Sequence, residues 1–211
     1  MVIQCQIRSK QVTTAREDLL AAGLAVFDRD GFEGATVAAI RTRARASNGS
    51  FFHFFGSKKQ LAGTLFLEIL ASYHAAIITA VDGSCAAREG VARLIRAHLD
   101  WVVNSRREAR YLFEISRSEW AEEIRGAQRA QNARLADAVE QWRAPLVERG
   151  ELLPMTSLVF FSQTIGPAQM FCRAWLSGRD GADPRDQTDI LIECAIRAVV
   201  APDAHHEPGE D

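Results

Sequence analysis

Basic, amide and hydroxyl side chains gather in one short stretch, residues 36–61, which reads TVAAIRTRARASNGSFFHFFGSKKQL. It holds three arginines, two lysines and no acidic residue, whereas the whole chain has a formal net charge of -2. Residues of these types suit a polyanion, because cationic groups neutralise phosphates while amides and hydroxyls hydrogen-bond to phosphates or base edges. The stretch is therefore the candidate for binding nucleic acid.

Two short helices must position these side chains. Thr36 and Ser47 are expected N-caps, because a hydroxyl there accepts a hydrogen bond from a free backbone N–H of the first turn. Phe51, Phe54 and Phe55 recur at helical spacing and predict the buried face of the second helix. The opposite face is a candidate reading surface, made of Ser47, Asn48, Gly49, Ser50, Phe52 and His53.

A third helix is expected to begin at Ser57, which forms a capping box with Gln60. Lys58 and Lys59 then fall in its first turn, where the helix dipole disfavours cations. A phosphate bound at that N-terminus would compensate both lysines and the free backbone N–H groups together. The arrangement predicts a helix-turn-helix whose second helix enters the major groove of DNA.

The segment ASNGSFFHFFGSKKQLAGTLF resembles the recognition segment of the TetR family of one-component bacterial transcription regulators. The resemblance covers residues 15–66; beyond them it consists of helix number, chain length and the WLSG sequence at 175–178. It implies an all-α protein of about nine helices, with an N-terminal three-helix DNA-binding domain and a C-terminal helical domain for ligand binding and dimerisation. The expected ranges are 1–56 for the first domain, 57–201 for the second and 202–211 for a disordered tail.

The sequence departs from the family pattern at several positions. Arg45 stands where the turn usually has Gly, so either the turn accommodates a side chain or Arg45 reaches the phosphate backbone, which we favour. Phe52 and Phe54 stand where Tyr is frequent, and Asn48, which can pair bidentately with adenine, replaces a frequent Lys or Arg. The expected DNA-binding residues are Thr36, Arg45, Ser47, Asn48, Gly49, Ser50, Phe52, His53, Lys58 and Lys59.

Composition agrees with a helical protein. The 211 residues are 47% hydrophobic, enough for one domain or two small ones, and they include six prolines and no segment that alternates as a strand does. Residues 1–60 carry a net charge of +4 and the remainder -6, which favours a basic module on an acidic body. Residues 1–12 are expected to be an arm, frayed or ordered on DNA, before a first helix that begins near Thr13 and ends at Gly31.

Other features exclude several classes of protein. The four cysteines are far apart, without the short spacings of a zinc site, and are predicted to be reduced. We find no glycine-rich phosphate loop, no metalloprotease motif and no nucleophile elbow, so no catalytic residue, metal site or cofactor is predicted. With no signal peptide and no membrane span in the sequence, we expect a cytoplasmic protein with no membrane partner.

An effector site is implied by the family resemblance in the second domain. Histidine, glutamine and tyrosine on apolar helical stripes need hydrogen-bond partners, and aromatic surface with a few polar groups is the usual lining of a small-molecule pocket. An ordinary core is the alternative for each residue taken singly. The candidates are Tyr73, His74, His98, Trp101, Phe113, Trp120, Gln163 and Met170.

The last two predicted helices, 156–177 and 185–200, are apolar on more than one face. Packing against the same helices of a second copy would cover them in a four-helix interface, so a homodimer is predicted. The candidate interface residues are Phe161, Ile165, Phe171, Cys172, Trp175, Ile190, Leu191 and Cys194.

The resemblance thus implies a DNA-binding repressor, released from a palindromic double-stranded operator by a small, largely apolar effector. Two alternatives stay open: an activator of the same fold, and a helical module whose helix-turn-helix docks a protein instead of DNA. An enzyme is not expected.

Overall fold

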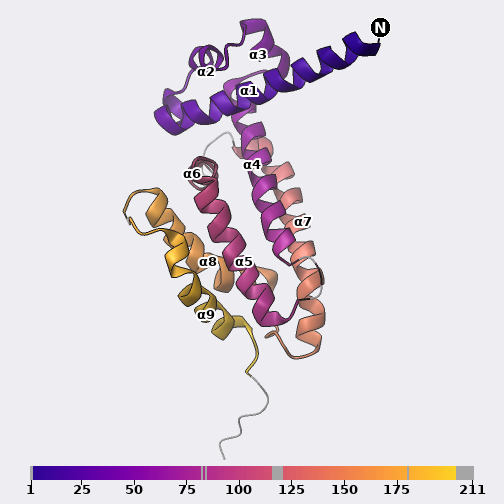
Figure 1. The fold of residues 1–211 in the computed structure, drawn as a ribbon, viewed down its shortest axis with the longest axis vertical. Helices are drawn as coiled ribbons and strands as arrows, with labels where there is room; N and C mark the ends of the chain where they lie inside the picture. Colours follow the sequence, from indigo (N-terminus) through magenta and orange to yellow (C-terminus); the bar gives the residue numbers. More distant parts are fainter. Residues whose placement is uncertain (1, 82, 84, 116–120, 180, 203–211) are drawn as a thin grey trace, which may run out of the picture. The chain divides into compact units, whose positions relative to one another are not determined.

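The computed structural model describes residues 2–81, 83, 85–115, 121–179 and 181–202; side chains are described from residue 15 onward, except at 114 and 115. These residues form helices in the order α1 (Val2–Gly34), α2 (Val37–Ala44), α3 (Asn48–Phe54), α4 (Lys58–Ala80), α5 (Ala87–Asn104), α6 (Arg106–Ile115), α7 (Ala121–Glu148), α8 (Ser157–Leu176), the 3-10 helix η1 (Pro184–Gln187) and α9 (Thr188–Val199). Across the described ranges no strand forms, and one isolated antiparallel bridge joins Leu152 to Val200. The all-α prediction is confirmed (Figure 1).

The chain divides into two compact units. The first comprises Met1–Ala71 and Ser105–Arg129, and the second Ser72–Asn104 and Ala130–Asp211. The first half of α4 and all of α6 group with the N-terminal helices, whereas the sequence predicts a domain boundary after residue 56. Because α4 is one continuous helix, its sequence pattern does not indicate a boundary within it.

Helix α1 organises the first unit. It begins at Val2 instead of Thr13, because no proline or glycine interrupts residues 2–22 and the arm continues the helix. Its regular turn ends at Gly31, as predicted, where φ is 69°. A Cβ added at Gly23 would lie 2.6 Å from Cδ2 of Leu61, so this glycine lets α4 approach α1 closely.

Helix α6 is tied to the same unit by polar and aromatic contacts. Asp28 of α1 pairs with Arg110 at 2.9 Å and with Arg107 at 3.3 Å. The Tyr111 hydroxyl donates to the Ala62 carbonyl at 3.0 Å, and its ring stacks on Phe27 with centroids 5.7 Å apart. Burial raises the pKa of Tyr111, so the hydroxyl stays protonated as a donor.

The second unit is built on α5, which packs against α8 and α9, while α8 and α9 lie side by side (Figure 1). Its core includes Val91, Leu94, Ile95 and Leu99, all fully buried on one face of α5. Helix α4 is the one described helix long and apolar enough to cross a membrane, and half of that stretch is buried within the structure. A buried core helix of a globular protein has the same composition.

Candidate functional site

Helices α2 and α3 are capped as the sequence predicted. The Thr36 hydroxyl accepts from the Ala39 N–H at 3.1 Å, and the Ser47 hydroxyl accepts from the Ser50 N–H at 3.0 Å. Between the helices Arg45 adopts the left-handed conformation, with φ 53° and ψ 33°, and its N–H donates to the Thr42 carbonyl at 3.2 Å. The turn therefore accommodates a side chain where glycine is favoured, and it leaves that side chain exposed.

The two faces of α3 separate as expected. Phe51 and Phe55 are buried, although Phe54 is only half-buried. On the other face Phe52 is 51% exposed, a large apolar surface for a side chain on a basic module. The remaining predicted reading residues are also accessible: Ser47, Asn48, Gly49 and His53 are exposed, and Ser50 is half-buried.

Asn48 is held by a neighbour from α2. Its Oδ1 accepts from a terminal guanidinium nitrogen of Arg41 at 3.0 Å. That bond orients the amide and leaves its Nδ2 hydrogens to donate outward. Asn48 is the first residue of α3 and is exposed, as its predicted role in reading base edges requires.

The two lysines of α4 have different surroundings. The Lys58 ammonium donates to the carbonyl oxygens of Phe32 at 2.7 Å and Ala35 at 2.9 Å, and lies 4.4 Å from the centroid of the Phe32 ring. Lys59 is exposed. The compensation that we assigned to a bound phosphate therefore comes, for Lys58, from carbonyls at and just after the end of α1, and a phosphate contact stays a prediction for Lys59.

The capping box at α4 is present with one change. The Ser57 hydroxyl accepts from the Gln60 N–H at 3.1 Å, and Gln60 Oε1 accepts from the Gly56 N–H at 2.6 Å, one residue earlier than expected. Both bonds fix the start of α4 directly after α3. The lysines are thereby held beside the recognition segment.

A polar pair lies in the aromatic core of the second unit. The Tyr73 hydroxyl and His98 Nδ1 share a hydrogen bond at 3.0 Å, and the Trp101 ring lies against Tyr73 with centroids 5.0 Å apart. Burial lowers the pKa of His98 to about 4, so the imidazole is neutral at pH 7. Burial, followed by the nearby Cys172, raises the pKa of Tyr73. The pair is thus an uncharged hydrogen-bonding group among apolar rings.

The other predicted effector residues do not all gather there. His74 is buried, and burial lowers the pKa of its imidazole. Phe113 belongs to the first unit, and Trp120 lies outside the described residues. Gln163 and Met170 are exposed on α8, Met170 by 73%, so they do not fit a buried pocket. A helix apolar on all faces gave no sign of which face would be covered.

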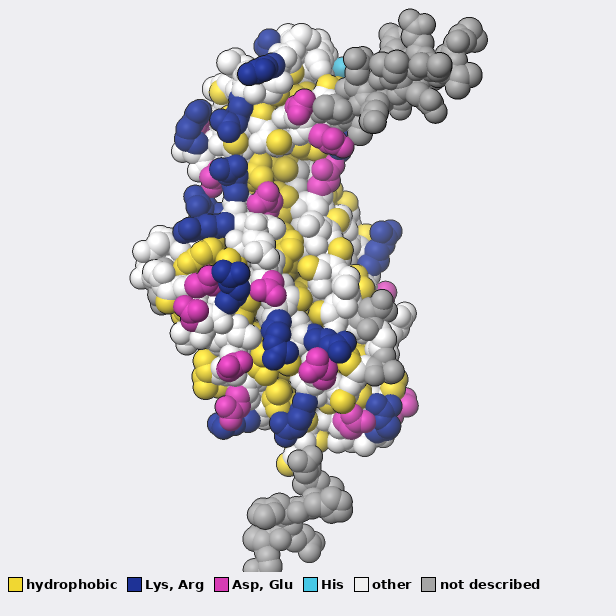
Figure 2. Space-filling model, viewed as in Figure 1, with side chains coloured by type: hydrophobic (Ala, Val, Ile, Leu, Met, Phe, Trp, Pro, Cys, Tyr) yellow, Lys and Arg dark blue, Asp and Glu magenta, His cyan; other side chains and the backbone are white. Residues whose placement is uncertain are grey.

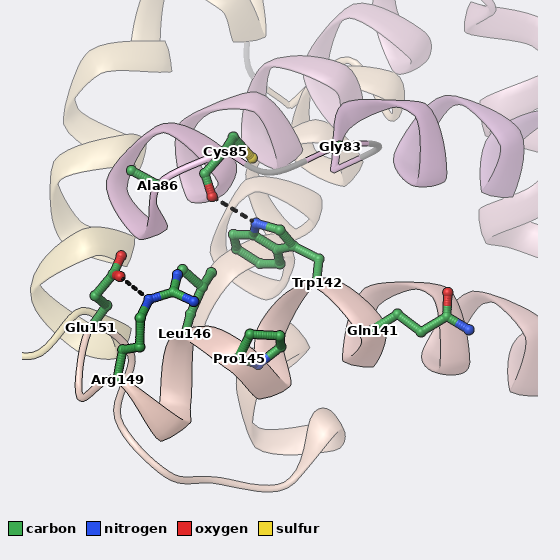
Figure 3. Close-up of a pocket in the computed structure, with 9 residues that line it drawn as sticks. All are labelled: Gly83, Cys85, Ala86, Gln141, Trp142, Pro145, Leu146, Arg149 and Glu151. Atoms are coloured by element: carbon green, nitrogen blue, oxygen red, sulfur yellow. Dashed lines mark hydrogen bonds and ion pairs between the residues drawn. The ribbon is translucent and has the colours of Figure 1, made fainter.

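A cavity that the sequence did not predict lies between the start of α5 and the end of α7 (Figure 3). It measures about 360 Å³, and the Trp142 indole forms one wall and donates from Nε1 to the Cys85 carbonyl at 3.2 Å. At its rim Arg149 pairs with Glu151 at 2.7 Å, which lowers the pKa of that carboxyl. None of the predicted effector residues lines it.

The predicted dimer residues fall on both sides of α8 and α9. Ile165 and Cys172 are buried within the chain, so their assignment to a dimer surface does not fit. Burial also raises the pKa of Cys172 to about 12. Ile190 and Cys194 are exposed on α9. The others, Phe161, Phe171, Trp175 and Leu191, are half-buried.

Several apolar side chains on these two helices are exposed in a single chain. Leu158 is 78% exposed, Met170 73%, Ile190 54% and Val159 45%. The sequence indicated the open surface of these helices, but Ile165 and Cys172 of α8 are not part of it. In the described ranges no three His, Cys, Asp or Glu side chains come together as metal ligands would.

Three comparisons agree with this arrangement. The sequence pattern of bacterial regulatory proteins of the tetR family matches residues 19–65, which contain α2, α3 and the start of α4. The HTH-type transcriptional repressor NicS of Pseudomonas putida is 31% identical over 70 residues, a third of this chain and a third of that protein's length.

Solved structures extend the likeness to the whole fold. A TetR family transcription regulator from Marinobacter aquaeolei is 20% identical, with a TM-score of 0.74 over 92% of this chain and 100% of that one. The regulator FadR of Bacillus subtilis, solved with stearoyl-CoA, is 15% identical, with a TM-score of 0.72 over 85% of this chain and 97% of its own. The fold of both units therefore matches these regulators.

Proposed function

We propose that this chain is a bacterial regulatory protein of the tetR family, which binds operator DNA as a homodimer and represses transcription. The observation that carries the proposal is the exposed surface of α2 and α3, with its arginines and Asn48 and without an acidic residue from 36 to 61. Such a surface suits insertion of α3 into the major groove. Family members of this kind are not enzymes.

The exposed residues sort into two groups by chemistry. Arg43, Arg45 and Lys59 carry free positive charge beside the helix ends and suit the phosphate backbone. Asn48 and His53 on α3 offer donors to base edges, and the exposed ring of Phe52 suits a thymine methyl group. Phosphate contacts would thus position the module, and α3 would read the sequence.

Dimer formation is supported by the exposed apolar side chains of α8 and α9. Leu158, Met170 and Ile190 are each more than half exposed in the single chain, which is unusual for large apolar residues unless a partner covers them. A stable interface should bury more than about 1,000 Å² in total. A two-fold dimer would bind a near-palindromic operator, with both recognition helices on one side of the duplex.

Release by an effector is the second half of the proposal. The neutral Tyr73–His98 pair, with Trp101 beside it, suits a small and largely apolar molecule that carries one or two uncharged hydrogen-bonding groups. Binding would shift α4 and weaken operator affinity, a coupling typically of about 1–3 kcal/mol. The relative from Pseudomonas putida is named a transcriptional repressor, which supports that role.

Selection from random double-stranded DNA, followed by mobility shifts over a range of salt, tests the first half. We expect a near-palindromic site, lost when Asn48 and His53 are both changed to Ala. Only asymmetric sites, or weak binding that is the same for every sequence, would contradict the proposal and leave a protein-docking role for the helix-turn-helix.

A ligand panel on the selected operator tests the second half. Aromatic and acyl molecules should include at least one that releases DNA, and Tyr73→Phe should weaken its effect without changing operator affinity in its absence. If no member of the panel alters operator binding, effector release is removed from the proposal, and DNA binding remains part of it.

A further inference from the structure

A groove runs between α5 and α9 in the second unit, away from the Tyr73–His98 pair. Its volume is about 710 Å³. Ile192 and Ile196 of α9 and Leu153 give it apolar walls, while Arg88 and Arg96 of α5 line it from the other side. Figure 2 shows apolar, basic and acidic side chains alternating over the lower part of the molecule, where α5 and α9 lie in Figure 1. A groove of this kind suits an anionic, partly apolar occupant.

The arginines of α5 give the groove its positive charge. Arg88 and Arg96 are exposed, and no other described residue forms a hydrogen bond or an ion pair with either. Arg197 on the opposite wall is already paired with Glu193. Asp189 is the remaining acid of the lining. Among the described residues of the lining, two guanidinium groups and one carboxylate are therefore left without an ion-pair partner, and guanidinium binds carboxylates through parallel hydrogen bonds.

The chain leaves α9 at the wall of this groove. The Leu153 N–H donates to the Val199 carbonyl at 2.9 Å, and the Ala201 N–H donates to the Glu151 carbonyl at 3.0 Å. With the bridge between Leu152 and Val200, these bonds pin the exit of the chain. Val200, Ala201 and Pro202 themselves line the groove, so the described part of the chain ends at its edge.

Residues 203–211, which lie outside the described residues, read DAHHEPGED and hold four acidic residues and no Lys or Arg. Nine residues reach up to about 30 Å when extended, enough to follow a groove whose wall they start from. Tethering raises their effective concentration at the groove to the order of 1 mM. The negative charge of this segment, its reach and its starting point together favour it as the occupant of the groove over a separate acidic partner.

We propose that residues 203–211 bind back along the α5–α9 groove, with their carboxylates on Arg88 and Arg96. This contact is independent of DNA binding and of the effector.

The test uses a labelled synthetic peptide of residues 203–211 and two proteins, the full chain and a chain that ends at Pro202. The peptide should bind the shortened chain with a Kd of about 0.1 mM. At an effective concentration of about 1 mM, the tethered segment should weaken peptide binding to the full chain roughly tenfold. Affinity for the shortened chain should fall as salt rises.

Charge variants locate the contact. In the shortened chain, Arg88→Glu with Arg96→Glu should abolish peptide binding, whereas Arg129→Glu with Arg134→Glu on α7, outside the groove, should leave it unchanged. If circular dichroism shows that the first pair disturbs the fold, Arg88→Gln with Arg96→Gln replaces it and should weaken binding at least fivefold.

Three results would overturn the proposal. Equal peptide affinity for the full and shortened chains would mean that the segment does not occupy the groove. Peptide binding that survives the changes at Arg88 and Arg96 would place the contact elsewhere. If the full chain binds the peptide more weakly as the protein concentration rises, the segment occupies the groove of a second copy.

Discussion

The ammonium group of Lys58 lies 2.7 Å from the carbonyl oxygen of Phe32, twenty-six residues earlier in the chain. The same nitrogen also bonds the Ala35 carbonyl and lies over the Phe32 ring. A cation at a helix N-terminus is thus stabilised by carbonyl groups at and just after the end of α1, where the last carbonyls of a helix lack helical partners. Lys58 thereby joins the start of α4 to the segment that enters α2.

This relationship predicts different behaviour for the two lysines. Lys58→Ala should lower the free energy of unfolding by about 1.5–3 kcal/mol, because it removes charge-assisted bonds to two carbonyls. The salt slope of DNA binding should stay nearly unchanged, since the ammonium already has partners in the chain. Denaturant unfolding and mobility shifts at several salt concentrations measure both effects.

Lys59→Ala is the matched control for Lys58. It should leave stability within about 0.5 kcal/mol and lower the salt slope by roughly 1 per subunit, as expected when one cation no longer neutralises a phosphate. A salt slope that falls for Lys58→Ala and not for Lys59→Ala would return the phosphate contact to Lys58.

Asn48 should determine sequence preference at one position of each half-site. Asn48→Ala should reduce discrimination there by about 1–3 kcal/mol, because the amide no longer pairs with the base while the phosphate contacts remain. Arg41→Ala, which removes the guanidinium that orients the amide, should reduce it less. Binding to single-base variants of the operator gives both values, and a uniform loss across all variants would show that Asn48 contacts the backbone.

The exposed face of α8 and α9 should hold the dimer together. Met170→Glu and Ile190→Glu should each shift the protein toward monomer, since a carboxylate would be buried in an apolar interface. Ala133→Glu, on an exposed position of α7, should leave the mass unchanged. Light scattering at micromolar concentration measures the mass, and a monomer before any substitution would remove the homodimer from the proposal.

Stability should fall in mild acid because of His98. Its pKa is about 4 in the folded chain and about 6.5 when unfolded, so between these values the unfolded state binds the extra proton. The free energy of unfolding should therefore be fully present above about pH 6.5 and drop by about 2 kcal/mol by pH 5. His74, whose pKa is also lowered, should add a loss of the same sign.

Two variants separate burial from hydrogen bonding as the cause of the lowered pKa of His98. His98→Gln should remove most of the acid dependence, whereas Tyr73→Phe should retain it, because burial and not the shared hydrogen bond lowers the pKa of His98. Urea unfolding at pH 7.5 and pH 5.0 decides the matter. Loss of the acid dependence in Tyr73→Phe would assign the shift to the hydroxyl.

Gly90 and Gly126 form a matched pair inside helices. A Cβ at Gly90 would lie 2.0 Å from the Trp142 ring, so Gly90→Ala should destabilise the chain by about 1–3 kcal/mol or displace Trp142 from the Cys85 carbonyl. Nothing lies within 4 Å of a Cβ at Gly126, so Gly126→Ala should stabilise it by about 0.5–1 kcal/mol. Thermal unfolding, followed by indole fluorescence, measures both changes. Equal destabilisation by Gly90→Ala and Gly126→Ala would show that the effect at Gly90 does not come from packing against Trp142.

Local patterns were sufficient to predict the helix-turn-helix. The caps at Thr36 and Ser47 and the buried faces of Phe51 and Phe55 depend on side chains within four residues of one another, so the sequence carries them directly. The absence of acids from this stretch is likewise a property of the sequence. These local features carry the resemblance to the tetR family.

What the sequence left undecided depends on residues far apart in the chain. Periodicity does not show which side of α8 is covered when every side is apolar, so Cys172 was placed outside and Met170 inside, the reverse of what packing against α5 and α9 produced. No sequence pattern predicted the burial of Arg143, which is 1% exposed and donates to the Met155 carbonyl at 2.9 Å. The contacts of Lys58 likewise form only because the end of α1 lies beside the start of α4. Each of these contacts requires elements to be packed before it exists, so tertiary structure alone decided them.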